Sequence, residues 1–153
     1  MTLATVRSPR RIAIAAIAAA LLGATALLAV SAPAANATYG RCDSGEFCLY
    51  RDTTMRGAIY QFSGSDSNLN TDRFEVASRN ERVGNNTYSV WNRAAPAAKE
   101  YVVIYDRVGH RGFDACVLPG DRGQVPRFWW KNIESYKWVT PGACFDAGVI
   151  NLD

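Results

Sequence analysis

Apolar and polar residues alternate in two similar stretches of the chain. The first is residues 47–62, FCLYRDTTMRGAIYQF, and the second is residues 102–117, VVIYDRVGHRGFDACV. A constant offset of 55 residues aligns Leu49 with Ile104, Tyr50 with Tyr105, Arg56 with Arg111, Gly57 with Gly112 and Phe62 with Val117. Period-two apolar positions on either side of a polar excursion predict two β-hairpins, so the repetition indicates a duplicated supersecondary unit.

The excursion of each predicted hairpin ends in a glycine, Gly57 or Gly112. We expect both at positions that need a positive φ or a close approach, where a Cβ would clash. A phosphate-binding loop is the alternative, but neither glycine has a flanking lysine or a helix start.

Short strands and loops are expected in the rest of the folded part. Residues 87–91 and 133–139 predict the strands that close the first and the second unit. Residues 63–72 and 119–126 are polar or turn-rich and predict loops, and residues 92–100 predict the linker between the units. Outside the N-terminal run, nothing has a sustained helical period.

The N-terminal segment has the organisation of a secretory signal peptide. Three arginines precede an Ala-rich apolar run at residues 12–30, and small residues follow, ending in Ala35-Asn36-Ala37. A retained membrane helix is the alternative, since 19 such residues could just span a bilayer. The cleavage site favours removal of residues 1–37, which leaves residues 38–153 as a secreted, extracellular domain without a membrane anchor.

Removal of this segment also changes the charge balance. It takes away 3 of the 17 basic residues and none of the 14 acidic ones, so the mature chain carries 14 of each. A nearly neutral chain lacks the basic face that a nucleic-acid partner requires, and none is expected. The remaining 116 residues contain all 17 aromatic residues, enough for one domain with a modest core, which we expect to be a monomer.

All four cysteines, Cys42, Cys48, Cys116 and Cys144, lie in the mature part. An oxidising compartment favours disulfides, for which three pairings exist. We favour Cys42 with Cys48 and Cys116 with Cys144, because each pair lies within its own copy of the repeat. A zinc site is not expected, since there is no Cys-x-x-Cys spacing and one histidine, His110.

The sequence contains no catalytic motif. His110 stands without a serine or cysteine motif beside it, so a structural role is favoured over a catalytic one. An acid/base pair such as Asp114 and Glu134 is conceivable, but 14 carboxylates make any chosen pair uninformative. We expect neither an enzyme nor a cofactor.

Each hairpin has a Tyr and, seven residues later, a Gly, as in Tyr50 with Gly57 and Tyr105 with Gly112. This spacing resembles the Tyr-x4-aromatic-x-Gly motif of the βγ-crystallins. The resemblance implies an all-β double Greek-key sandwich, with unit one at about residues 40–91, unit two at about 101–140 and a tail at 141–153. Met55 and His110 replace the aromatic residue of the motif. Both can cover a hairpin as an apolar lid.

Behind the signal peptide, Cys42 with Cys48-Leu49-Tyr50 resembles the opening of the streptomycete metalloproteinase-inhibitor family. The superfamily's calcium motif is altered in both units, at residues 80–85 and 130–135. Gly84 has lost a side-chain oxygen and Lys131 opposes a cation, although Glu134 could supply one ligand. Weak or no metal binding is expected.

The resemblance implies a secreted inhibitor of an extracellular zinc metalloprotease that acts through a rigid, disulfide-held segment. In the family the reactive bond joins a disulfide-bonded Cys to a Val, which implies Cys116, Val117 and Leu118 as the inhibitory segment. Thermolysin-like proteases prefer a bulky apolar residue after the scissile bond, as Val117 would be. The repeat favours a core role instead, because it aligns Cys116-Val117 with the second strand of the first hairpin.

The alternative function is a non-inhibitory β-domain that binds a cell-wall polymer, another protein or weakly held calcium. Its candidate contact is Phe128-Trp129-Trp130, because adjacent aromatic rings can stack on sugars. In a small β-domain such residues are more often part of the core.

Overall fold

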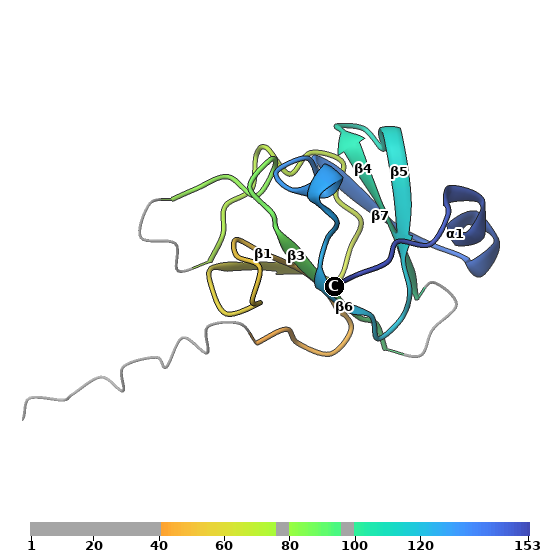
Figure 1. Ribbon diagram of the computed structural model, residues 1–153, viewed down its shortest axis with the longest axis horizontal. Coiled ribbons are helices and arrows are strands. Elements are labelled where there is room, and N and C mark those ends of the chain that lie inside the picture. Colours follow the sequence, from red (N-terminus) through yellow and green to blue (C-terminus); the bar gives the residue numbers. More distant parts are fainter. Residues whose placement is uncertain (1–40, 76–79, 96–99) are drawn as a thin grey trace, which may run out of the picture. The chain divides into compact units, whose positions relative to one another are not determined.

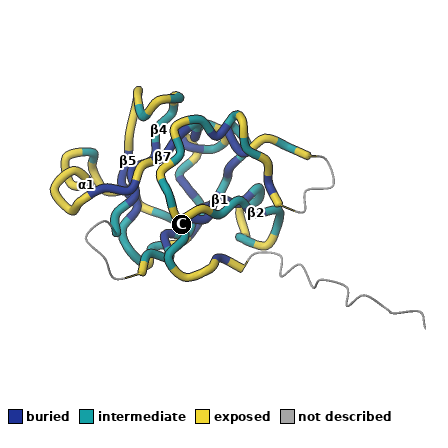
Figure 2. The backbone as a smooth tube through the Cα atoms, turned by 180° about the vertical axis from the view of Figure 1, so that it is seen from behind, coloured by how far each residue is buried: buried dark blue, intermediate teal, exposed yellow. Residues whose placement is uncertain are grey.

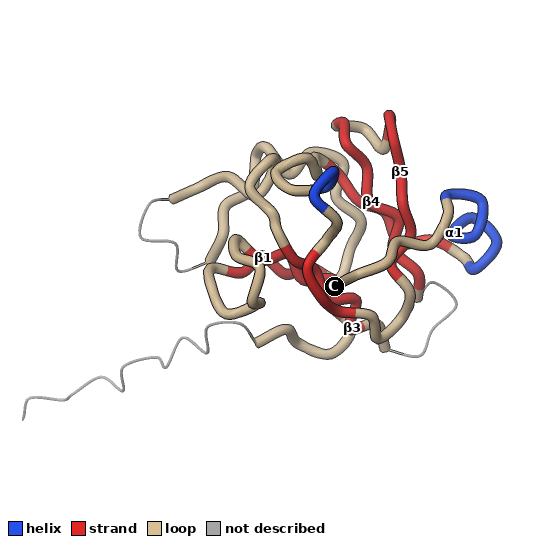
Figure 3. Tube along the Cα trace, in the orientation of Figure 1, coloured by secondary structure: helices blue, strands red, loops and turns tan. Residues whose placement is uncertain are grey.

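The computed structural model describes residues 41–75, 80–95 and 100–153. They form two antiparallel sheets, with strand orders β2-β1-β3-β6 and β5-β4-β7 (Figure 1). The strands are β1 Glu46–Tyr50, β2 Ile59–Phe62, β3 Ser89–Arg93, β4 Tyr101–Arg107, β5 Arg111–Val117, β6 Arg122–Gln124 and β7 Ser135–Val139. A 3-10 helix, η1 Arg127–Trp129, and a short helix, α1 Pro141–Ala147, complete the described part (Figure 3). The predicted all-β sandwich is confirmed.

The duplicated unit is visible in the strand register. In β1 and β2, Phe47 faces Phe62, and in β4 and β5 the equivalent residues Val102 and Val117 face each other at the same offset of 55. The closing strands β3 and β7 then pair with β1 and β4 in the same way. The hairpin repeat therefore extends to the pairing of individual residues.

A serine at the start of each closing strand ties down the excursion of its hairpin. The Ser89 hydroxyl donates to the Asp52 carbonyl at 2.6 Å, and the Ser135 hydroxyl donates to the Arg107 carbonyl at 2.6 Å. Asp52 and Arg107 are again 55 residues apart. The two units thus use the same polar contact to fix the same turn.

The two units exchange segments at the sheet edges. Strand β6 belongs to the second unit but completes the first sheet, where Gly123 faces Val90. In return, Asp66 of the first unit forms a bridge with Tyr136 on β7. The prediction that residues 119–126 are entirely loop was therefore wrong, since a three-residue strand forms there against a partner from the other unit.

The main core lies between the sheets and contains apolar residues from both. Phe47 and Tyr136 meet there with ring centroids 4.9 Å apart. Figure 2 shows the buried strand positions in dark blue and the exposed outer half of β5 in yellow. A separate small cluster of buried residues surrounds each disulfide.

The disulfides join Cys42 to Cys48 and Cys116 to Cys144, which is the pairing favoured from the sequence. The second bond attaches helix α1 to strand β5, and the tail beyond α1 then follows the β5 edge. There the Cys116 N–H donates to the Gly148 carbonyl at 2.8 Å, and the Ile150 N–H donates to the Cys116 carbonyl at 2.9 Å.

Helix α1 differs from the expectation of strand and loop, because seven residues are too few to show a helical period. It begins at Pro141, whose missing N–H costs nothing in a first turn. Within the described ranges, none of the helices has the length and apolar character to cross a membrane. The predicted signal peptide lies outside the described residues.

Candidate functional site

The predicted inhibitory segment lies inside the domain. Cys116 and Val117 have no exposed surface, and Val117 belongs to the core between the sheets, while Leu118 is partly buried. The main chain at Cys116 has partners on both sides, Val103 of β4 on one and the tail residue Val149 on the other. The Asn92 side chain also donates to the Val117 carbonyl at 3.0 Å.

A peptidase reaches a bond only when the main chain around it is accessible, which Cys116–Val117 is not in this fold. Contact there would require β5 to leave its sheet and the tail to detach. The structure thus places Val117 in the core, as the repeat suggests.

His110 is a structural residue of the β4–β5 hairpin. Its Nε2 lies 3.0 Å from the Tyr136 carbonyl and 3.2 Å from the Asp66 carbonyl, and its ring packs on Tyr105 at 5.5 Å. Both oxygens can only accept, so Nε2 carries the hydrogen. Met55 at the equivalent position packs on the cluster around the first disulfide. Both residues have a positive φ, 58° for His110 and 55° for Met55.

The two repeat glycines are required by close contacts. A Cβ on Gly112, whose φ is +88°, would lie 1.8 Å from Asp106 Oδ1. A Cβ on Gly57 would lie 2.3 Å from Asp52 Oδ2. In both hairpins an aspartate side chain occupies the space, and it accepts main-chain hydrogen bonds from residues of the same hairpin.

The residues aligned with the calcium motif have internal partners. Glu134 accepts from the Asn85 amide at 2.6 Å and from the Val108 N–H at 3.1 Å, so both carboxylate oxygens are used within the protein. Lys131 lies over the Tyr88 ring at 5.7 Å. Across the described residues, no group of three or more His, Cys, Asp or Glu side chains could hold a metal ion.

The run Phe128-Trp129-Trp130 is divided between the interior and the surface. Trp129 is buried in the core, and the Trp130 indole donates to the Val125 carbonyl at 2.8 Å. Phe128 is 56% exposed and meets Phe113 of β5, which is 66% exposed, with ring centroids 5.7 Å apart. A continuous three-ring platform for sugars is therefore not present.

Sequence reasoning missed the pairing of Phe113 with Phe128. The period-two alternation of β5 puts Phe113 on the same face as the core residues Ala115 and Val117. From this pattern one could have predicted that the apolar face of β5 continues outward past the core to Phe113. The partner ring comes from η1, and no local pattern indicates that contact.

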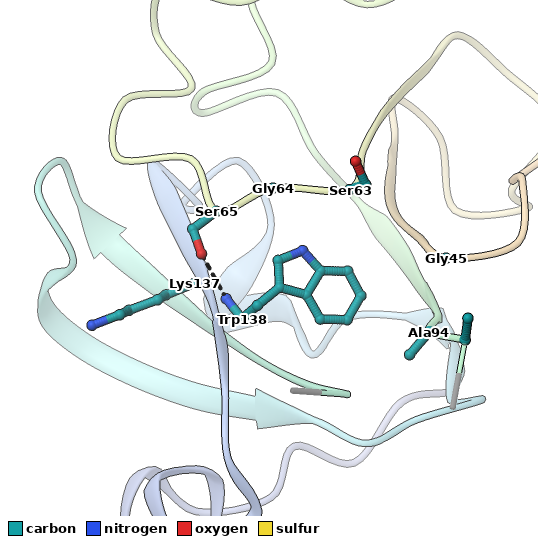
Figure 4. Close-up of a pocket in the computed structure, with 8 residues that line it drawn as sticks. Gly45, Ser63, Gly64, Ser65, Ala94, Lys137 and Trp138 are labelled. Atoms are coloured by element: carbon teal, nitrogen blue, oxygen red, sulfur yellow. Dashed lines mark hydrogen bonds between the residues drawn. The ribbon is translucent and has the colours of Figure 1, made fainter. Parts of the chain in front are cut away.

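A pocket of about 410 Å³ opens between the two sheets (Figure 4). Small residues line it, together with Lys137 and the ring of Trp138: Gly45, Ser63, Gly64, Ser65, Ala94 and Ala95. The Trp138 main-chain N–H is bonded to the Ser65 hydroxyl at 3.0 Å. The Trp138 indole N–H is buried and has no hydrogen-bond partner within the described part of the chain.

Comparison with known proteins agrees with this architecture. The model of peptidase inhibitor family I36 matches residues 35–117, more than half of the chain and both hairpins. The chain belongs to this peptidase inhibitor family. The resemblance predicted from the Cys42–Tyr50 opening is therefore confirmed, and membership of an inhibitor family makes the protein a binding protein rather than an enzyme.

The fold has counterparts among solved structures. One, described as "Evolution of the eye lens beta-gamma-crystallin domain fold", is 14% identical with a TM-score of 0.50, and the match covers 65% of this chain and 91% of the other. A βγ-crystallin from Ciona intestinalis is 18% identical with a TM-score of 0.46 over 62% and 100%. The first likeness supports the βγ-crystallin fold. No curated protein matches the sequence.

Proposed function

We propose that the protein is secreted and inhibits an extracellular zinc peptidase by presenting a rigid surface to its active-site cleft. The observation that carries this proposal is the family match, which spans both hairpins and the first disulfide. Zinc specificity rests on the Cys42–Tyr50 opening, which resembles the streptomycete metalloproteinase inhibitors. The signal-peptide pattern and two disulfides support secretion.

Rigidity is the physical basis of such inhibition. A surface already held in its bound conformation loses little conformational entropy on association, so more of the contact energy appears as affinity. Each hairpin is fixed by a disulfide on its outer face and by a serine that bonds the turn. These contacts restrict both hairpins before any peptidase arrives.

The proposal is tested by assaying the secreted protein, starting at Thr38, against thermolysin-like zinc, subtilisin-like serine and papain-like cysteine peptidases. We expect tight inhibition confined to the zinc peptidases. Reduced and alkylated protein is the control, since loss of the disulfides removes the rigid surface without changing the sequence. Inhibition of serine or cysteine peptidases alone would contradict zinc specificity, and no inhibition in any class would contradict the function.

A further inference from the structure

We infer that Phe113 and Phe128 form the main contact with the inhibited peptidase, inserting into an apolar pocket with acidic residues at its edge. This inference rests on the proposed inhibitory function and places its contact away from Cys116–Val117. It follows from the exposure of the two rings, the rigidity of their support and the charge around them.

The two rings form one exposed apolar unit from distant parts of the chain. Phe113 stands on the outer half of β5 and Phe128 on η1, and their rings meet edge to face at 86°. Phe128 also meets the buried Trp129 ring at 5.3 Å and 87°, which anchors the pair to the core. Exposed aromatic residues held on a fixed support are typical of the residues that dominate binding energy at interfaces.

The hairpin that carries Phe113 is fixed by polar contacts along its exposed end. The N–H of Phe113 donates to Asp106 at 2.8 Å, and the N–H of Gly109 donates to the Ser67 carbonyl at 2.7 Å. The N–H of His110 donates to the Ser135 hydroxyl at 3.1 Å. The outer hairpin is therefore ordered although residues 111–114 are exposed, and a partner need not order it on binding.

The charge around the pair indicates the nature of the partner. Arg107, Arg111 and Arg127 are exposed in the segments that carry the two rings, against one exposed acid, Asp114. The Arg127 guanidinium lies over the Trp130 ring at 5.4 Å, and Arg127 directly precedes Phe128 in the chain. A cationic edge around an apolar centre is complementary to an apolar pocket with an acidic edge, and such a charge pattern accelerates association.

The test compares the inhibition constant of the wild-type protein with those of Phe113→Ala and Phe128→Ala, against the peptidase that the wild type inhibits best. Phe145→Ala is the matched control, because Phe145 lies on helix α1, is 61% exposed and packs on the Tyr101 ring at 6.1 Å between centroids with a tilt of 58°. We expect each pair variant to weaken inhibition at least about 30-fold and the control less than about threefold. Urea unfolding of every variant is used to check that the folded fraction under assay conditions equals that of the wild type.

A wild type that inhibits while both pair variants inhibit equally well would overturn this inference and leave the inhibitory function intact. A wild type that inhibits no peptidase would overturn both. Should Phe128→Ala disturb folding through Trp129, Phe128→Leu keeps the buried contact and removes the aromatic edge, and it must still weaken inhibition.

A second measurement tests the charge of the partner. Arg111→Glu and Arg127→Glu should each slow association at low salt by about threefold or more, and this effect should disappear near 1 M salt because exposed charges are screened there. Lys137→Glu, at the pocket between the sheets, is the control. Equal slowing by the control would contradict a specific cationic edge.

Discussion

Replacement of Val117 by Ala separates a core residue from a reactive-site residue. Val117 is fully buried and faces Val102 between the sheets, so the substitution removes two methyl groups and leaves a cavity. Buried methyl groups contribute about 1 to 1.5 kcal/mol each once the cavity is included. We therefore expect the free energy of unfolding to fall by about 2 to 3 kcal/mol, with inhibition unchanged per folded molecule.

Urea unfolding followed by tryptophan fluorescence measures the loss of stability, and the inhibition constant is measured on the same samples. Val149→Ala is the control, because Val149 lies beside Cys116 but is 42% exposed. It should change the free energy of unfolding by no more than about 0.5 kcal/mol. An unchanged stability with inhibition weakened tenfold or more would refute the core assignment. It would return the contact to the Cys116–Val117 bond.

Three further changes test other parts of the structure. Replacing both Cys116 and Cys144 by Ser should lower the free energy of unfolding by about 3.5 kcal/mol. Replacing Cys42 and Cys48 should lower it by only about 2 kcal/mol, because that disulfide closes the shorter loop. Chemical unfolding measures both values. Asn92→Ala should cost about 2 to 3 kcal/mol, because the buried Val117 carbonyl loses its amide donor, and thermal unfolding measures the change. Burial, with the neighbouring Asp66 carboxylate, raises the pKa of Asp72 above its ordinary 3.8, so the folded state binds this proton more readily and stability falls as pH rises from 3.8 through the raised pKa. Asp72→Asn should flatten this pH dependence, and at pH values above the raised pKa it should increase the free energy of unfolding by less than about 1 kcal/mol. Unfolding measured across this pH range tests the prediction, and an equally steep pH profile in the variant would contradict it.

The sequence predicted the parts of the fold that depend on local patterns. The 55-residue offset located both hairpins, and it held down to the register of Phe47 with Phe62 and Val102 with Val117. Alternating apolar positions specify which residues face the core, and a duplicated pattern specifies it twice.

The parts that were missed depend on distant partners. Strand β6 consists of three residues, and its partner β3 belongs to the other unit. Nothing within Arg122–Gln124 indicates such a strand. The Phe113–Phe128 pair joins two elements in the same way. Val117 was ambiguous because a β-branched residue after a disulfide-bonded Cys fits a reactive bond and a core strand equally well. The burial of Cys116 and Val117 at the inner end of β5 distinguishes the two roles.

The central claim, that the protein inhibits a zinc peptidase through a preformed surface, is tested most directly by titrating a thermolysin-like zinc peptidase with the mature protein. The intact mass of the inhibitor recovered from the complex is then measured by mass spectrometry. Inhibition through a preformed surface predicts that activity is lost at about one inhibitor per enzyme and that the recovered chain is intact between Cys116 and Val117. Full activity at a tenfold excess of inhibitor, or a recovered chain cut at that bond, would contradict the account.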